Sequence, residues 1–154
     1  RLNAYEPETV TVDGLDYREG INAVSIHGGI AGNVIPDECV IEINFRFAPS
    51  RSEADALAYL SRMFDGYELV VTDSSAGARP GADSPLAQSF IASVGGEIAP
   101  KYGWTDVARF TALGIPAVNY GPGNPSLAHA DNEHVPLADL HACERGLRSW
   151  LTGV

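Results

Sequence analysis

Polar and apolar residues alternate most regularly over residues 40–48. The apolar positions of this stretch are Ile41, Ile43, Phe45 and Phe47. A period of two is typical of an antiparallel strand with one buried face. Residues 22–27 predict a second, shorter strand, and Gly28-Gly29 directly after it predicts that the chain turns there.

A helix is predicted to follow these strands. Ser52 has the position of an N-cap, and Asp55 lies three residues later, as in a capping box. The residues that then share one helical face are Ala54, Leu57, Ser61 and Phe64. Asp65-Gly66 ends the helix, and residues 67–72 predict another strand. Residues 20–74 are therefore expected to fold in the order β-β-α-β.

Residues 74–85 are small, polar and rich in turn residues, which is typical of a domain boundary. We expect one domain over residues 1–75 and another over residues 76–154. Three helices are predicted in the second domain, from Ser84-Pro85, over residues 105–113 and from Pro136. Two short strands are predicted between them, over residues 98–102 and 116–120. Alternating strands and helices favour an α/β architecture.

Composition narrows the class of protein. The 154 residues include 20 Asp+Glu against 10 Lys+Arg, a net charge of −10. This balance argues against a nucleic-acid partner, since phosphate binding needs clustered basic residues, and it disfavours an anionic membrane surface. No run of about 18 apolar residues is present to span a bilayer. Cys39 and Cys143 lie in apolar patterns without metal-site spacing, so we expect buried free thiols and a reducing, cytoplasmic location.

The strongest candidate for metal chemistry is His129. It follows a predicted strand and a Gly/Pro-rich loop, and α/β proteins place ligands at the carboxyl ends of strands. Residues 128–134 read Ala-His-Ala-Asp-Asn-Glu-His, which is dense in possible ligands. A zinc site needs three or four ligands. From the residues alone, a metal ligand and an acidic surface loop are equally good readings of this segment.

Three other places could bind an anion. Arg46 could clamp a carboxylate through both guanidinium nitrogens, or it could form a local ion pair with Glu42. The helix start at Thr105 could present free amides to a carboxylate, or Thr105 could simply cap its own helix. Residues 121–123 (Gly-Pro-Gly) could offer backbone amides, although alone they predict only a turn.

Several stretches resemble one known family. Residues 32–36 (GNVIP) and the strand end at residues 44–47 (NFRF) resemble the dimerisation-domain signature of the di-zinc amidohydrolases and exopeptidases. The segments that resemble the C-terminal catalytic part of that family are residues 103–110, 114–123 and 127–133. The resemblance runs in order from about residue 17 to about residue 140. It implies a partial ferredoxin-like dimerisation (lid) domain, followed by the C-terminal part of an α/β catalytic domain.

The resemblance implies a role for each matching position. His129 matches a zinc ligand, and Arg46 matches the arginine that receives a substrate carboxylate. Asn33 matches a lid asparagine that contacts substrate across a homodimer, and Glu133 matches an acid behind the histidine loop. The positions that match the lining of the substrate pocket are Thr105, Asp106, Arg109, Gly121 and Gly123. The implied substrate is a small amide carrying two carboxylates.

The departures from the family are equally specific. The family has two zincs per complete site and a catalytic base in a Glu-Glu pair, and this sequence contains no adjacent Glu-Glu. The other metal ligands, the first lid strand and an upstream lid histidine are also unmatched. We therefore expect a C-terminal fragment that contributes one zinc ligand, contains no catalytic residue and is inactive alone. One alternative stays within the family and is an N-acyl amino acid deacylase, an acetylornithine deacetylase or a metallocarboxypeptidase. The alternative from another class is a non-catalytic dimerisation or binding module.

Overall fold

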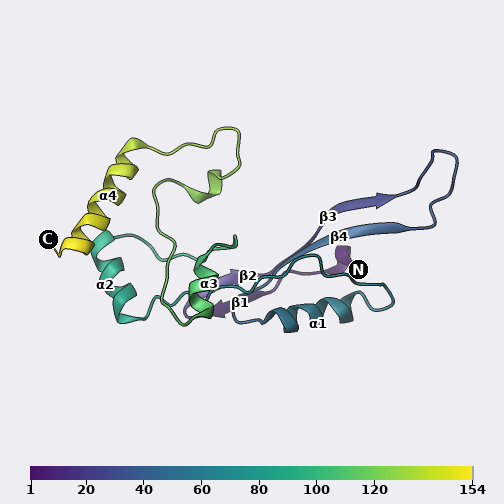
Figure 1. The fold of residues 1–154 in the computed structure, drawn as a ribbon, viewed down its shortest axis with the longest axis horizontal. Helices are drawn as coiled ribbons and strands as arrows, with labels where there is room; N and C mark the ends of the chain where they lie inside the picture. Colours follow the sequence, from purple (N-terminus) through teal and green to yellow (C-terminus); the bar gives the residue numbers. More distant parts are fainter. Residues whose placement is uncertain (154) are drawn as a thin grey trace. The chain divides into compact units, whose positions relative to one another are not determined.

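The computed structural model describes residues 1–153. The chain divides into two compact units. Unit 1 comprises residues 1–79 together with residues 100–104, and unit 2 comprises residues 80–99 together with the chain from Thr105 onward. Each unit is described by itself below, with its elements labelled in Figure 1. The domain boundary expected between residues 75 and 76 stays a prediction.

Unit 1 begins with a short 3-10 helix, η1 (Leu2–Ala4), and a hairpin of β1 (Thr9–Val12) and β2 (Leu15–Arg18). The two residues of its turn, Asp13 and Gly14, have φ angles of 49° and 80°. Positive φ at both positions is what a tight hairpin turn needs to match the twist of its strands. The hairpin carries the buried cluster of this unit, formed by Val12, Tyr17 and Ala48.

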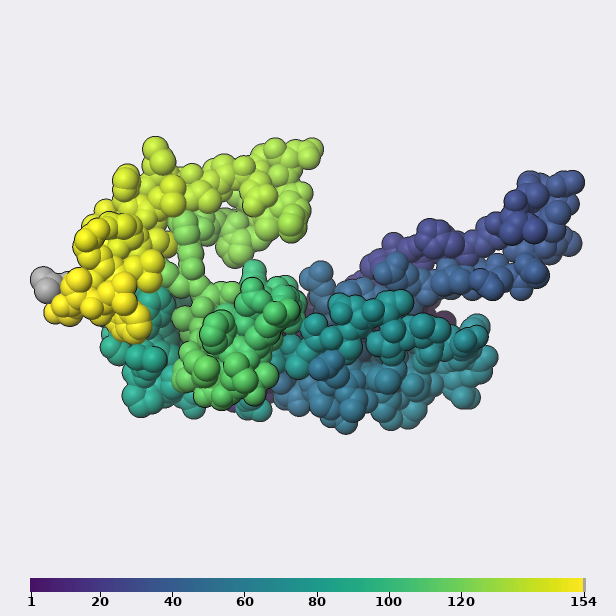
Figure 2. Space-filling view, viewed as in Figure 1, coloured from purple at the N-terminus to yellow at the C-terminus, as the bar shows by residue number. Residues whose placement is uncertain are grey.

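The central feature of unit 1 is a long antiparallel ribbon of β3 (Gly20–Gly28) and β4 (Cys39–Arg46). This confirms the predicted strand pair, and the mixed α/β class is confirmed with it. The register places Ile21 opposite Phe45 and Ile26 opposite Ile41, so one ribbon face is apolar. A bulge between Ala23 and Ser25 shifts the register by one residue. The dark blue end of the ribbon stands clear of the helix of the same unit in Figure 2.

Helix α1 (Glu53–Met63) covers the base of the ribbon. The capping box expected at Ser52 and Asp55 is present, because the Ser52 hydroxyl accepts from the Asp55 amide at 3.1 Å and the Asp55 carboxylate accepts from the Ser52 amide at 3.4 Å. The helix packs through Tyr59, whose ring stacks on Phe45 with a centroid distance of 5.6 Å. Sequence pattern therefore placed this helix correctly.

Unit 2 is built mainly from α2 (Pro85–Val94) and α4 (Leu137–Thr152), with the short helices α3 (Val107–Ala112) and η2 (Pro125–Leu127) between them. Phe90 is buried where α2 meets α4, and its ring makes edge contacts with Tyr120 and Trp150 at centroid distances of 5.1 and 5.2 Å. The helices approach closely at Gly146, where a Cβ would lie 3.3 Å from the Cα of Val94.

Two sets of expectations were wrong. The segments predicted as strands at residues 67–72, 98–102 and 116–120 have no strand structure. A strand needs a partner for its backbone hydrogen bonds, and no strand among residues 1–153 pairs with these segments.

The two cysteines are free, but Cys39 is exposed and Cys143 is only partly buried. Cys39 is the first residue of β4, on the part of the ribbon that α1 does not cover.

Candidate functional site

Arg46 is the last residue of β4 and is exposed to solvent. Alternation along the strand puts its side chain on the ribbon face opposite Phe45, and its register partner is Gly20, which has no side chain to cover it. Among residues 1–153, the guanidinium forms no ion pair, so the alternative of a local pair with Glu42 is wrong. Arg46 is therefore available to bind an anion over an open, polar surface.

Asn33 lies in the loop between β3 and β4, inside a turn closed by the Val34 amide, which donates to the Ala31 carbonyl at 3.2 Å. Arg46 lies at the other end of the ribbon, seven positions beyond Cys39. At about 3.3 Å per residue, the backbone positions of Arg46 and the loop that holds Asn33 are separated by more than about 20 Å of strand. A small ligand held by Arg46 therefore cannot also touch Asn33 of the same chain.

The predicted pocket residues at the start of α3 make local contacts. The Asn119 amide donates to the Thr105 hydroxyl at 3.1 Å, so this hydroxyl binds a neighbouring loop rather than capping the helix. Asp106 and Arg109 form an ion pair at 3.6 Å, with both side chains about three-quarters exposed (76% and 75%). Such an exposed pair is weak and can exchange its partner for a ligand.

The two glycines of the predicted Gly-Pro-Gly loop, residues 121–123, have different surroundings. Gly123 has a φ of 84°, and a Cβ there would meet the Val135 side chain at 3.1 Å. Gly121 has open space around the corresponding position. Gly123 is therefore required by the backbone and by close packing, whereas Gly121 leaves its surface accessible.

His129 is exposed and has a left-handed backbone, with a φ of 66°. Its main-chain amide donates to the Glu133 carboxylate at 3.0 Å. Within residues 1–153, no three His, Cys, Asp or Glu side chains come together to hold a metal ion. A zinc site needs three or four ligands, so this part of the chain offers one imidazole and does not complete a site.

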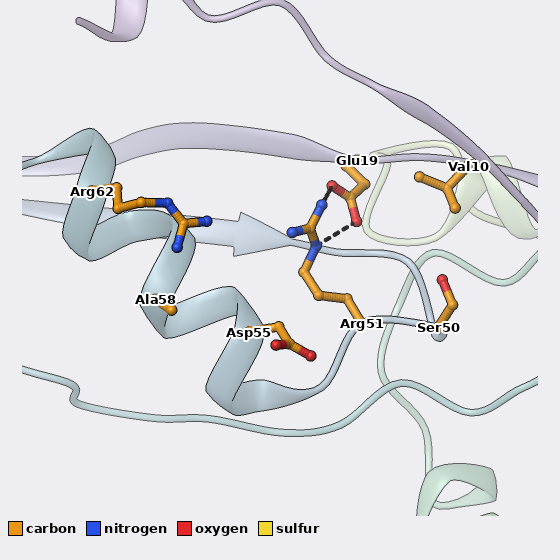
Figure 3. Close-up of a pocket in the computed structure, with 7 residues that line it drawn as sticks. All are labelled: Val10, Glu19, Ser50, Arg51, Asp55, Ala58 and Arg62. Carbon is orange, nitrogen blue, oxygen red and sulfur yellow. Dashed lines mark hydrogen bonds and ion pairs between the residues drawn. The ribbon is translucent and has the colours of Figure 1, made fainter.

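Sequence reasoning missed a buried ion pair in unit 1. Glu19 is 4% exposed, and its carboxylate accepts two hydrogen bonds from Arg51, at 2.8 and 3.1 Å, and one from the Ala48 amide at 2.8 Å. The hydrogen bond with Glu19 raises the pKa of Arg51. Glu19 and Arg51 line a hollow of about 360 Å³. Figure 3 shows the pair among the residues that line it. The partners are 32 positions apart, and no local pattern links them.

The Arg51 guanidinium also lies over the Tyr59 ring, 5.2 Å from its centroid. Arg51 thereby links the start of β3 to helix α1. Its Nε and Nη2 both donate to Glu19, and Nη2 also lies 3.9 Å from the Glu8 carboxylate. The Glu19–Arg51 pair is therefore a contact that stabilises the fold of unit 1. It does not replace the predicted binding residues.

Comparison with known proteins identifies the class of this fold. Residues 9–68, which contain both hairpins and helix α1, match the family model described as a peptidase dimerisation domain. This segment of the chain is therefore similar to the dimerisation domains of that peptidase family.

Related proteins extend the match along nearly the whole chain. A Mycobacterium tuberculosis protein provisionally named succinyl-diaminopimelate desuccinylase DapE is 51% identical over 99% of this chain and 44% of its own length. The Corynebacterium glutamicum succinyl-diaminopimelate desuccinylase is 41% identical over 99% of this chain and 43% of its own. An acetylornithine deacetylase of Myxococcus xanthus is 29% identical over 80% of this chain and 35% of its own. The chain thus spans less than half the length of these relatives.

The helices within residues 1–153 include none with the length and apolar composition that a membrane span requires.

Proposed function

We propose that the full-length protein is a zinc-dependent amide hydrolase that converts N-succinyl-LL-2,6-diaminopimelate and water into succinate and LL-diaminopimelate. The observation that carries this proposal is the 51% identity to a desuccinylase-named protein over 99% of the chain. In this proposal, residues 1–75 are an incomplete lid domain and residues 76–154 are the C-terminal segment of the catalytic domain.

Arg46 is proposed to receive a carboxylate of the substrate. Its guanidinium forms no ion pair with any of residues 1–153 and its side chain is exposed, so binding displaces no internal ion pair. Two parallel hydrogen bonds from one guanidinium fit a carboxylate and fix its orientation. The local charge of Arg46 has to hold this anion against the overall charge of −10.

Asn33 is proposed to act on the partner subunit's site in a homodimer. The length of the ribbon supports this assignment, because Asn33 lies too far from Arg46 of its own chain to share one small ligand with it. A projecting ribbon can reach a second subunit, and a dimerisation domain supplies the association.

Unit 2 is proposed to contribute the wall of the pocket and one metal ligand. The proposed lining residues are Thr105, Asp106, Arg109, Gly121 and Gly123. His129 is proposed to ligate one of two zincs, which when bound would activate water and polarise the amide carbonyl. The catalytic base and the other ligands are proposed to come from the remainder of the full-length protein, which leaves this chain inactive alone. We place the enzyme in the cytoplasm, where Cys39 and Cys143 stay reduced.

The test is hydrolysis by the full-length protein of N-succinyl-diaminopimelate, compared with N-acetylornithine and N-acetyl amino acids. We expect kcat/KM for the succinyl substrate to exceed the others by more than about 100-fold, because a site built for a second carboxylate leaves polar groups unpaired when that group is missing. Arg46→Gln should lower this ratio by about 10-fold or more through loss of a charged hydrogen bond. Arg18→Gln, an exposed arginine of β2, is the matched control.

Two other candidates remain distinct in this assay. Faster turnover of N-acetylornithine would favour a deacetylase, the activity named for the Myxococcus xanthus relative. Absence of hydrolysis with every substrate, in a zinc-loaded and dimeric protein, would favour a dimerisation module without catalysis.

A further inference from the structure

Gly20, the first residue of β3, is a glycine that the fold of residues 1–153 does not require. Its φ is not positive, so its backbone conformation also suits a residue with a side chain. A Cβ at Gly20 would have no neighbour among residues 1–153 closer than 3.8 Å, its adjacent residues in the chain excepted, so an alanine fits without a clash. A glycine inside a strand often marks a place where a ligand approaches the backbone closely.

The atom that borders this open position is the amide nitrogen of Asn22, 3.8 Å from where a Gly20 Cβ would lie. Asn22 is exposed, and its side chain forms no hydrogen bond with any of residues 1–153. The Asn22 amide group carries two N–H donors. Both donors are therefore open to an acceptor from outside the chain.

Arg46 begins directly across the ribbon from Gly20. On one face of an antiparallel pair, directly opposite positions have Cβ atoms about 4.5–5.5 Å apart. The three methylenes of the arginine stem are flexible, so the guanidinium can reach the space above Gly20. We call the space bordered by Gly20, Asn22 and Arg46 the Gly20 site.

The charges around the Gly20 site favour an anion. Glu19 precedes Gly20 in the chain, but its carboxylate is paired with Arg51 at 2.8 Å. Glu42 shares the strand face of Arg46 and lies four positions from it, about 13 Å along the strand. That separation exceeds the Debye length of about 8 Å at physiological ionic strength, so Glu42 opposes an anion only weakly. The Gly20 site therefore keeps the positive charge of Arg46.

We propose that the Gly20 site holds the substrate carboxylate, with the Asn22 amide donating to one oxygen while the Arg46 guanidinium binds from the other side. Gly20 is then a glycine because a side chain would occupy the place of the carboxylate. Donors on two sides fix the orientation of a carboxylate better than one guanidinium at the end of a flexible stem. This inference rests on the proposed role of Arg46, to which it adds a second donor and a steric requirement.

The experiment uses the zinc-loaded full-length protein and its two proposed products, succinate and LL-diaminopimelate, titrated separately by calorimetry. The product that loses affinity in Arg46→Gln is the one that reports on the Gly20 site. We expect Asn22→Ala to weaken that product about 10-fold, the lower end for a hydrogen bond to a charged group, because water reaches the site. KM for N-succinyl-diaminopimelate should rise by a similar factor while kcat stays within about 2-fold, as for the loss of uniform binding.

Gly20→Ala tests the steric requirement. It should weaken the same product by about 10-fold or more without lowering the Tm, because the added methyl group meets no closer neighbour than 3.8 Å among residues 1–153 and an alanine restricts the unfolded chain. Asn44→Ala is the matched control. Asn44 is exposed and lies opposite Asn22, but none of its atoms lies within 4 Å of the Gly20 Cβ position. Its loss should stay within about 2-fold.

Three results would overturn the Gly20 site. In the first, neither product loses affinity in Arg46→Gln. In the second, Gly20→Ala binds both products like the wild type. In the third, Asn22→Ala and Asn44→Ala lose equal affinity, which would assign the effect to the general polarity of the ribbon face. If the wild type hydrolyses none of the amides, the proposed function fails, and the titrations still decide the Gly20 site. Normal hydrolysis with unchanged binding in Asn22→Ala and Gly20→Ala overturns the site alone.

Discussion

The Glu19–Arg51 pair gives the sharpest prediction about stability. Glu19 is 4% exposed, whereas the Arg51 side chain is 22% exposed. Glu19→Ala removes the acceptor of the Ala48 amide, and Ala48 is itself only 1% exposed. An unsatisfied buried amide costs about 1–3 kcal/mol. Arg51 then loses its buried partner but keeps an ion pair with Glu8 at 3.9 Å and stays partly exposed, so it adds less than the about 3–5 kcal/mol of a fully buried unpaired charge. We expect a total loss of about 3 kcal/mol.

Glu19→Gln isolates one part of this loss. The glutamine oxygen can still accept from the Ala48 amide, but the glutamine NH2 group then faces the Arg51 Nη2, so the charge-assisted hydrogen bond at that atom is lost. We expect a loss of about 1–2 kcal/mol. In a double-mutant cycle with Arg51→Met, the coupling energy should be about 2 kcal/mol, within the range for directly contacting residues.

The measurement is urea unfolding followed by tryptophan fluorescence. A Trp150→Phe background leaves Trp104, which belongs to unit 1, as the reporter. The control cycle is Asp13 with Arg79, an ion pair whose side chains are 29% and 55% exposed. Its coupling should stay at about 1 kcal/mol or less. If the Glu19–Arg51 coupling does not exceed that of the control, burial does not strengthen the pair and our reasoning is refuted.

Two further predictions concern local packing and capping. Gly146→Val should destabilise unit 2 by about 1–3 kcal/mol, because its Cβ would lie 3.2 Å from the Val94 side chain and 3.3 Å from the Val94 Cα. Ala142→Val, at an exposed position of α4, should lose only about 0.6 kcal/mol of helix propensity in thermal unfolding, and equal losses would contradict the packing argument. The Ser52 hydroxyl lowers the pKa of Asp55 below 3.8, so the capping contribution is present above that pH and is lost as the pH falls through the folded pKa. Ser52→Ala should return the pKa of Asp55 toward 3.8 in a carboxyl NMR titration, and an unchanged pKa would show that the hydroxyl is not its cause.

Local pattern predicted much of unit 1. The alternation over residues 40–48 placed β4, and the signals at Ser52 placed α1, because periodicity and capping act within a few residues. The β1–β2 hairpin was not predicted, although Asp13-Gly14 between alternating residues is a strong hairpin signal. That omission was avoidable.

The false strands had a different cause. Residues 67–72 and 116–120 have strand-forming composition, yet strand structure depends on a partner as much as on propensity. The same limit applies to the site. Sequence pointed to Arg46, but only the folded structure shows that its guanidinium forms no ion pair with any of residues 1–153.

The sequence by itself determined the ribbon's alternation, the caps of the helices and the family resemblance of its segments. Tertiary structure decided which strands find partners and that Glu19 is buried against Arg51. The physical reason is how far apart in the sequence the interacting residues lie. Periodicity and capping are set by neighbours within one or two turns, whereas strand pairing and buried charge depend on residues that only the folded chain brings together.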